Sequence, residues 1–183
     1  MLTEEETVTV NGRSFVTTFD SSQSEVVATS AEGRTTVTEL NDTGRPTQVS
    51  MTGHYPINFT YYSGLGPHWN RLHTISQGEG GEERTYVLSY DDEGNLASIA
   101  APLGKTVSFT HDASGRVTSK TFPDGEKVRF EYDPSGNIVA IAQPGSPRYY
   151  YYPDVHSFGH GPLDQLTLYN PPVVAAAGPW DLP

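Results

Sequence analysis

The stretch FTHDASGRVTSKTFPDGEKVRFEYDPSGNIVAIAQPG, residues 109–145, decides the fold, because it repeats one short pattern at a fixed interval. Asp112 is followed by Gly115, and 21 residues after Asp112 the chain has Asp133, which is followed by Gly136 at the same spacing. The pattern has two competing interpretations. It marks either a catalytic or metal-binding device used twice, or the turns of a repeating fold.

The same pattern extends through most of the chain. Gly94, Gly115 and Gly136 follow one another at intervals of 21 residues, and each precedes Asn or Arg and then Leu, Val or Ile. Looser copies occupy residues 13–33, 36–53 and 57–80. The first has lost the glycine, the second has one residue fewer between aspartate and glycine, and the third inserts GLGPHW at the turn. Equal spacing with matching chemistry predicts six repeat units over about residues 7–145.

Each unit is predicted to contain two strands and two turns. In KVRFEY the apolar Val128, Phe130 and Tyr132 alternate with charged residues, which is the period of two of a half-buried strand. In each D-x-x-G turn the aspartate side chain can accept backbone N–H groups, and the glycine supplies a positive φ. The predicted turn residues are Asp42, Gly44, Asp91, Gly94, Asp112, Gly115, Pro123, Asp124, Gly125, Asp133 and Gly136.

These patterns predict an all-β fold, an antiparallel strip of successive β-hairpins without significant helix. No linker divides the chain, so we expect a single domain over residues 1–183. Residues 146–183 are rich in proline and contain a run of tyrosines at 149–152, which predicts an irregular tail that wraps across the strands. LDQLTLYNPPVV, residues 163–174, is expected to add one strand before its prolines end it.

Composition excludes several classes of function. The formal net charge of −11 opposes binding to nucleic acid or to an anionic membrane. The absence of cysteine rules out disulfides and thiolate metal sites. The first ten residues do not resemble a signal peptide, and no apolar run has the length of a membrane span.

The sequence supports catalytic or metal-binding roles for these residues less well than it supports a structural role. Turn capping explains the recurrence of the three aspartates without catalysis, and we predict no cofactor. His156 and His160 have the spacing of two zinc ligands on a helix, but Gly159, Gly161 and Pro162 oppose a helix there. No nucleophile motif is present, so we predict no enzyme activity, and a metal-dependent hydrolase at the two histidines is the weakest alternative.

The repeats resemble a known family. The order aromatic residue, Asp, two residues, Gly, Arg or Asn, and an aliphatic residue is similar to the YD repeats of bacterial Rhs proteins, insecticidal Tc toxin C subunits and animal teneurins. Tyr90-Asp91 and Tyr132-Asp133 fit as written, whereas His111-Asp112 and Phe19-Asp20 vary the aromatic residue. PGSPRYYYYP and YNPPVV also follow the repeats in the order seen in Rhs proteins.

The resemblance implies a structural role. In that family the hairpins build a β-shell that encloses a C-terminal toxin or forms a large scaffold. We therefore expect this chain to be an internal segment of a bacterial, secreted or cell-surface shell, with the remaining shell and its passenger as partners. A cut segment exposes strand edges, so we also expect self-association by edge pairing. The alternative is a carbohydrate-binding module in which outward-facing tyrosines, at 61–62 and 149–152, stack on sugar rings.

Overall fold

A computed structural model describes residues 3–145 and 155–172 of the chain. In this part of the chain, fifteen strands form one antiparallel sheet in which each strand lies beside its neighbours in sequence, from β1 to β15. The helical content of the same residues is limited to two three-residue 3-10 turns, η1 (Gly80–Glu82) and η2 (Pro102–Gly104). The prediction of an all-β strip of successive hairpins is confirmed.

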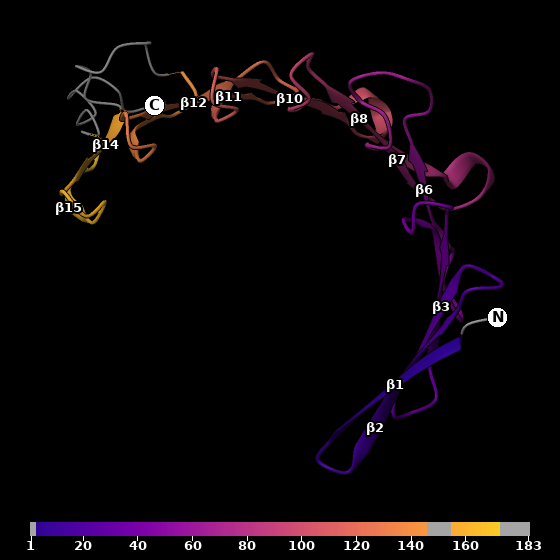
Figure 1. Cartoon of the computed structure of the whole chain (residues 1–183). Coiled ribbons are helices and arrows are strands. Elements are labelled where there is room, and N and C mark those ends of the chain that lie inside the picture. The colour runs from indigo at the N-terminus through magenta and orange to yellow at the C-terminus, as the bar shows by residue number, and fades with distance from the viewer. Residues whose placement is uncertain (1–2, 146–154, 173–183) are drawn as a thin grey trace, which may run out of the picture. The chain divides into compact units, whose positions relative to one another are not determined.

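The chain divides into two compact units. Figure 1 shows the strands coloured by their position along the chain. The first contains Met1–Ser89 and Ile99–Gly104, and the second contains Tyr90–Ser98 and Lys105–Pro183. The prediction of a single domain over residues 1–183 stays a prediction.

The first unit consists of consecutive hairpins. Its strands are β1 (Thr3–Val10), β2 (Arg13–Asp20), β3 (Glu25–Thr29), β4 (Thr35–Leu40), β5 (Pro46–Met51), β6 (Ile57–Tyr61), β7 (Leu72–Gln77) and nearly all of β8 (Arg84–Tyr90). Cross-strand pairs divide its residues between two chemically different faces. Phe59 pairs with Ile75, and Ile75 pairs with Tyr86, so these apolar side chains share one face. The opposite face has a polar row, in which Gln48 donates a hydrogen bond to Asn58 over 2.9 Å.

The second unit repeats the hairpin with greater regularity. After β9 (Leu96–Ala100), which contributes residues to both units, its strands are β10 (Thr106–His111), β11 (Val117–Thr121), β12 (Lys127–Tyr132), β13 (Ile138–Ala142), β14 (Val155–His160) and β15 (Leu166–Asn170). The register shifts by one residue just before the turns that follow β10, β12 and β14. A shift of this kind is expected where a type I turn is followed by a residue of positive φ.

The end of the chain differs from the sequence prediction. Where an irregular wrapping tail was expected over residues 146–183, residues 155–170 form a regular hairpin, in which β14 pairs with both β13 and β15. The expected strand within residues 163–174 is present as β15. The prediction of an irregular tail is wrong for this hairpin because Phe158, Leu166, Leu168 and Tyr169 preserve a strand pattern between the prolines. The tyrosine run at 149–152 lies outside the described residues.

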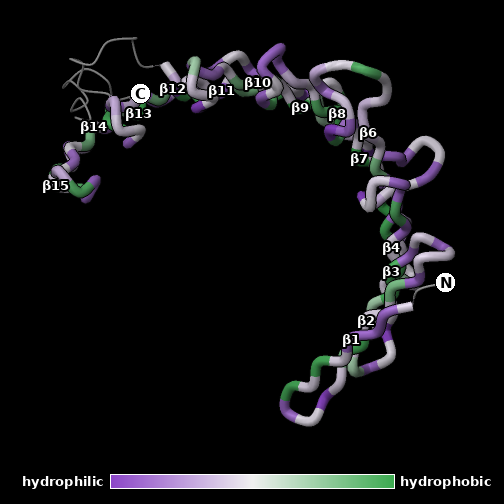
Figure 2. The backbone as a smooth tube through the Cα atoms, viewed as in Figure 1, coloured by the Kyte–Doolittle hydropathy of each residue, from purple (hydrophilic) through white to green (hydrophobic). Residues whose placement is uncertain are grey.

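The sheet has almost no buried core in the described residues. Only Gly94 and Ala140 are buried, and Ala140 retains 2% of its accessible surface. Figure 2 shows hydrophobic residues spread along the strands of both units rather than gathered in one region. Most apolar side chains are therefore covered only by neighbours on the same face of a single-layer sheet. The part of the chain described here also has no helix with the length and apolar character needed to span a bilayer.

Candidate functional site

Three turns of the second unit share one backbone frame, and the structure places predicted residues at their first and fourth positions. The first residue donates its N–H to the carbonyl of the fifth, and the N–H of the fourth donates to the carbonyl of the first, over 2.9–3.0 Å. The first positions belong to Asp91, Asp112 and Asp133. The fourth belong to Gly94, Gly115 and Gly136, whose φ values are 87°, 76° and 96°. This left-handed backbone explains why glycine recurs there.

The aspartate carboxylates cap these turns. Asp112 Oδ1 accepts the N–H groups of Ser114 and Arg116 over 2.9 and 3.0 Å, and its Oδ2 accepts Arg116 Nε over 2.7 Å. Asn95 and Asn137 make the corresponding contacts to their own aspartates, with both the backbone N–H and the side-chain amide donating. The carboxylate therefore needs a donor side chain at the fifth position, which explains why Asn or Arg follows each glycine.

These contacts favour the ionised carboxylates. The backbone N–H of Arg116 is the largest cause that holds the pKa of Asp112 below its ordinary value of 3.8, and the N–H of Asn137 does the same for Asp133. Partial burial raises the pKa of Asp91, but the Asn95 hydrogen bonds and the nearby His111 outweigh it, so the net shift is also downward. The three aspartates are thus ionised acceptors whose lone pairs are used inside their turns.

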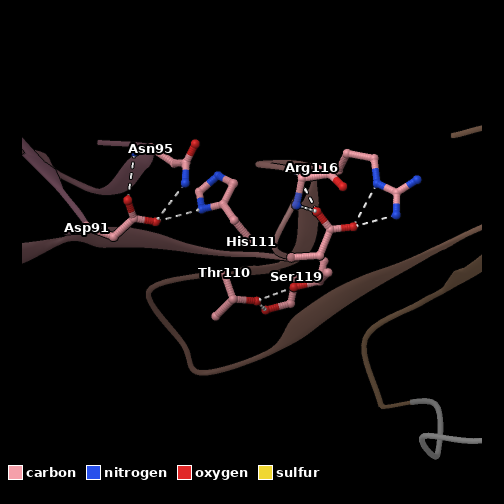
Figure 3. A network of polar contacts seen from close by, with 9 residues as sticks. Asp91, Asn95, Thr110, His111, Arg116 and Ser119 are labelled. Atoms are coloured by element: carbon pink, nitrogen blue, oxygen red, sulfur yellow. Dashed lines mark hydrogen bonds and ion pairs between the residues drawn. The ribbon is translucent and has the colours of Figure 1, made fainter. Parts of the chain in front are cut away.

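Side chains at the fifth position also reach the next turn in the row of turns at the same ends of the strands. Arg116 donates from Nη1 to the carbonyl of Asp133 over 3.3 Å, and Asn137 donates from Nδ2 to Asp164 Oδ1 over 2.9 Å. A β-carbon added to Gly115 would lie 3.0 Å from Asn95 Oδ1. Figure 3 shows the network around Asp91, Asn95, His111 and Arg116. We call this series of turns, beginning at Asp91, Asp112, Asp133 and Gly161, the turn ladder.

The aromatic residue before the turn is hydrogen-bonded to the backbone. Tyr132 donates from its hydroxyl to the carbonyl of Val117 over 2.8 Å, and the Arg116 guanidinium lies 4.6 Å from the centre of its ring. His111 occupies the corresponding position before Asp112. Its Nδ1 lies 3.4 Å from Asp91 Oδ2, without hydrogen-bond geometry, and its side chain is 8% exposed. This burial agrees with a packing role for His111, in the position that tyrosine holds before Asp91 and Asp133.

The turns at the other ends of the strands have the same pattern of backbone hydrogen bonds but a different cap, as the turn between β11 and β12 shows. Phe122 donates to the carbonyl of Glu126 over 2.8 Å, and Gly125 donates to the carbonyl of Phe122 over 2.9 Å. Asp124 accepts the N–H of Glu126 over 3.0 Å from inside the turn. The predicted Pro123-Asp124-Gly125 segment is therefore the centre of a five-residue turn that begins at Phe122.

Asp42 does not have the capping position predicted for it. Asn41 is the first residue of that turn, and its Oδ1 accepts the N–H groups of Thr43 and Arg45 over 3.0 and 2.9 Å. Gly44 does lie at the fourth position, with a φ of 75°. The prediction for Asp42 is wrong because the frame has two residues between the cap and the glycine, and Asn supplies the same acceptor oxygen as Asp.

Several turn residues were missed. Asn11-Gly12 forms the two-residue turn between β1 and β2, and their positive φ values of 51° and 76° fit the common Asn-Gly hairpin signal. Asp164 stands where the other copies have glycine and has a φ of 56°. Asn70, with a φ of 61°, closes the turn enlarged by GLGPHW. Asn and Asp tolerate this conformation better than most residues, so a search for glycine alone overlooks them.

The two candidate zinc ligands lie on β14, not on a helix. His156 Nδ1 is 2.8 Å from the Tyr169 hydroxyl, and His156 Nε2 is 2.6 Å from Gln143 Nε2. His160 lies four residues farther along this strand, in the position before the turn that begins at Gly161. Among residues 3–145 and 155–172, no group of three or more His, Asp or Glu side chains is arranged to hold a metal ion.

The tyrosines proposed to stack on sugars have backbone partners where the structure describes them. Tyr61 donates from its hydroxyl to the carbonyl of Pro46 over 2.7 Å, and Tyr62 donates to that of Leu88 over 2.9 Å. These hydroxyls connect strands. The carbohydrate-binding alternative stays a prediction.

The fold and the turn ladder together define a β-hairpin repeat protein. Residues 1–160 match the family model of the Teneurin YD-shell. The chain belongs to this YD-shell family, which confirms the resemblance drawn from its repeats. No curated protein matches the chain.

Solved structures show the same fold in a much larger molecule. The chain is similar to one in the crystal structure of TcdB2-TccC3-Cdc42, with 16% identity and a TM-score of 0.58, and the match covers 90% of this chain. It is similar to TcdB2-TccC3-TEV, with 15% identity, a TM-score of 0.58 and 90% coverage. The form of TcdB2-TccC3 without its hypervariable C-terminal region gives 14% identity, a TM-score of 0.57 and 84% coverage. This chain spans 8% of the length of each matched chain.

Proposed function

We propose that this chain is a wall segment of a YD-type β-shell, which encloses a passenger polypeptide or serves as a surface scaffold. The wall acts by excluding other macromolecules from the passenger, and it carries out no reaction itself. Its partners are the rest of the shell and the enclosed passenger. The proposed location is outside a bacterial cell or on its surface, as part of a larger protein.

The observation that carries this proposal is the single-layer sheet of consecutive hairpins. Within the described residues only Gly94 and Ala140 are buried, so the sheet leaves two broad faces, as a wall requires. Hydrogen-bonded strands lie about 4.8 Å apart, which is too close for a polypeptide or a protease to pass between them. Continuous strand pairing therefore supports a barrier function.

The turn ladder supports the structural role from a second direction. Asp91, Asp112 and Asp133 would be the strongest candidates for acid chemistry, but each carboxylate accepts hydrogen bonds from within its own turn. Their lowered pKa values keep them ionised near neutral pH, when they cannot donate a proton. Carboxylates held in this way suit rigid turns at the ends of the strands better than an active site.

Protection of the passenger from protease tests the proposal. The complete shell is purified with its passenger, and digestion of the passenger is followed by mass spectrometry. Gly115→Val combined with Gly136→Val is expected to speed digestion, because both substitutions disturb turns that hold neighbouring hairpins together. Leu65→Ser, in the enlarged turn and outside the strands, is the matched control and should leave digestion unchanged. Equal digestion of the passenger with and without the intact shell would contradict the enclosing role.

A further inference from the structure

The turn between β1 and β2 has a chemically labile sequence. Asn11 and Gly12 form its two-residue loop, in which both have positive φ, and Val10 pairs with Arg13 to close it. Both loop residues are exposed, and a β-carbon added to Gly12 would have no atom within 4 Å. Among the residues that the structure describes, neither the Asn11 side chain nor the Gly12 N–H has a hydrogen-bond partner. The Asn11 amide is therefore open to attack by the Gly12 nitrogen.

The other six asparagines of the chain lack this combination. None of them precedes glycine, so the next residue either hinders its own nitrogen with a side chain or, as Pro171 after Asn170, has no N–H. Each of their side chains also has a hydrogen-bond partner. These residues are Asn41, Asn58, Asn70, Asn95, Asn137 and Asn170. The labile combination is therefore specific to Asn11.

We infer that Asn11 is a site of spontaneous deamidation, and that the isoaspartate formed there loosens the β1–β2 hairpin as the protein ages. The Gly12 nitrogen attacks Asn11 Cγ, a new N–Cγ bond forms, and the bond from Cγ to Nδ2 breaks. The Gly12 amide proton leaves with the side-chain amide as ammonia, and a succinimide ring remains. Water then opens the ring. Breakage of the N–Cγ bond gives aspartate, and breakage of the original peptide bond gives isoaspartate.

The reaction can take place in the folded chain. Water is its only co-reactant, and it needs no oxidant or reductant. An exposed loop tip opens locally without unpairing the strands that support it, which gives the Asn11 side chain the freedom to approach the Gly12 nitrogen. The turn is formed by residues 10–13 alone, so no step depends on what lies beside β1. The inference is therefore independent of the enclosing role proposed above.

The isoaspartate product cannot keep the geometry of this turn. Its main chain runs through the former side chain and gains an extra carbon atom between residues 11 and 12. A two-residue loop of this type matches the twist of its strands only with ordinary backbone spacing. The closing pair of Val10 and Arg13 is therefore expected to weaken first, followed by the 3.0 Å hydroxyl contact between Thr9 and Ser14.

Peptide mapping of the aged chain tests the site. The purified chain is incubated in mildly acidic or mildly alkaline buffer and is then digested with trypsin in heavy-oxygen water, which labels any deamidation that occurs during digestion. Asn11 is the one asparagine in the peptide of residues 1–13. We expect this peptide to gain aspartate and isoaspartate, several-fold faster in alkali because the attacking nitrogen must lose its proton. Protein isoaspartyl methyltransferase identifies the isoaspartate. Peptides with Asn95 and Asn137 are the internal controls and should stay unchanged.

Two variants separate the chemistry from its structural effect. Gly12→Ala puts a side chain beside the attacking nitrogen and should slow deamidation several-fold. Asn11→Asp has the new charge with an ordinary backbone, and Asp-Gly also favours this turn. Amide hydrogen exchange at Val10 and Arg13 should therefore speed up in the aged parent chain but not in freshly purified Asn11→Asp.

The peptide map of the parent chain remains decisive if Gly12→Ala disturbs the hairpin. An unchanged Asn11 after ageing in alkali, or deamidation of Asn95 or Asn137 at the same rate, would overturn the assignment of the site. Equal hydrogen exchange in the isoaspartate form and the fresh parent chain would overturn its effect on the hairpin.

Discussion

The turns at Asn41 and Asp112, one in each unit, solve the same geometric problem with different side chains. Both have a glycine of positive φ at the fourth position and the same pair of backbone hydrogen bonds. Asn41 caps with one neutral oxygen, whereas Asp112 uses both carboxylate oxygens and binds the Arg116 guanidinium. The backbone frame is therefore the fixed part of the repeat, and the strength of the cap varies.

The tyrosine that precedes the turn also makes the same contacts in both units. Tyr61 in the first unit and Tyr132 in the second donate to the carbonyls of Pro46 and Val117, respectively. An arginine lies over each ring, at 5.6 Å for Arg45 and 4.6 Å for Arg116. Contacts that connect one strand to the next recur in both units, even where the adjoining turn has been enlarged.

Of the changes that separate the two units, replacing the turn glycines should lower the free energy of unfolding the most. Gly115→Val forces a β-branched residue into positive φ and places its β-carbon 3.0 Å from Asn95 Oδ1, so we expect a loss of about 1–3 kcal/mol. Gly44→Val has the same φ problem but no atom within 4 Å, so its loss should be smaller. Urea denaturation of both variants measures the difference. Equal stability of Gly115→Val and the parent chain would show that the turn has been assigned wrongly.

Removing the caps should have the next largest effect. Asp112→Ala leaves the N–H groups of Ser114 and Arg116 without their acceptor and frees the guanidinium, so its melting temperature should fall. Asn41→Ala should lower the melting temperature by less, because only a neutral cap is lost. Asp112→Asn is the conservative control and should recover part of the loss. The same melting temperature for Asp112→Ala and Asn41→Ala would contradict the ranking of the caps.

Acid should weaken the second unit through its aspartates. The pKa values of Asp91, Asp112 and Asp133 are lowered on folding from the ordinary value of 3.8. The stability that these carboxylates contribute is therefore fully present above that pH. It is lost as the pH falls through the folded pKa values. Asn41 has no proton to take up in this range. Amide hydrogen exchange at decreasing pH, corrected for intrinsic exchange rates, should therefore show protection lost at the Asp112 turn. Similar relative losses at both turns would argue against this linkage.

The tyrosine hydroxyls should give the smallest effects. Tyr132→Phe removes the hydrogen bond to the Val117 carbonyl in a partly buried site, so we expect a loss of about 0.5–1.5 kcal/mol. Tyr61→Phe removes the corresponding contact in an exposed site and should cost less, because water replaces the lost partner. Chemical denaturation of the two variants provides the measurement. A larger loss for Tyr61→Phe would reverse the expected order.

The sequence predicted the parts of the fold that depend on local chemistry. Gly94, Gly115 and Gly136 mark the turns because few other residues tolerate their backbone conformation. Asn41 was missed because it caps its turn where the clearest copies have aspartate. Asp164 was missed because it adopts the positive φ that glycine adopts in those copies. The ladder contacts, such as Asn137 to Asp164, connect residues 27 positions apart. Their detection requires the register of the intervening strands, which repeat spacing alone does not provide.

The β14–β15 hairpin illustrates a different limit. Proline and glycine around residues 155–170 suggested an irregular segment, but Pro162 lies within the turn, where it removes no hydrogen bond from the strands. The composition of a segment therefore mattered less than the position of each proline in the strand pattern.

The chain-order pairing of the strands has a consequence for folding. Each hairpin forms from residues close in sequence, so the chain entropy lost in closing it is small. Such contacts can form successively as the polypeptide leaves the ribosome, without waiting for a distant strand. The newest hairpin then provides the template for the next, and synthesis and assembly of the sheet can proceed in the same direction.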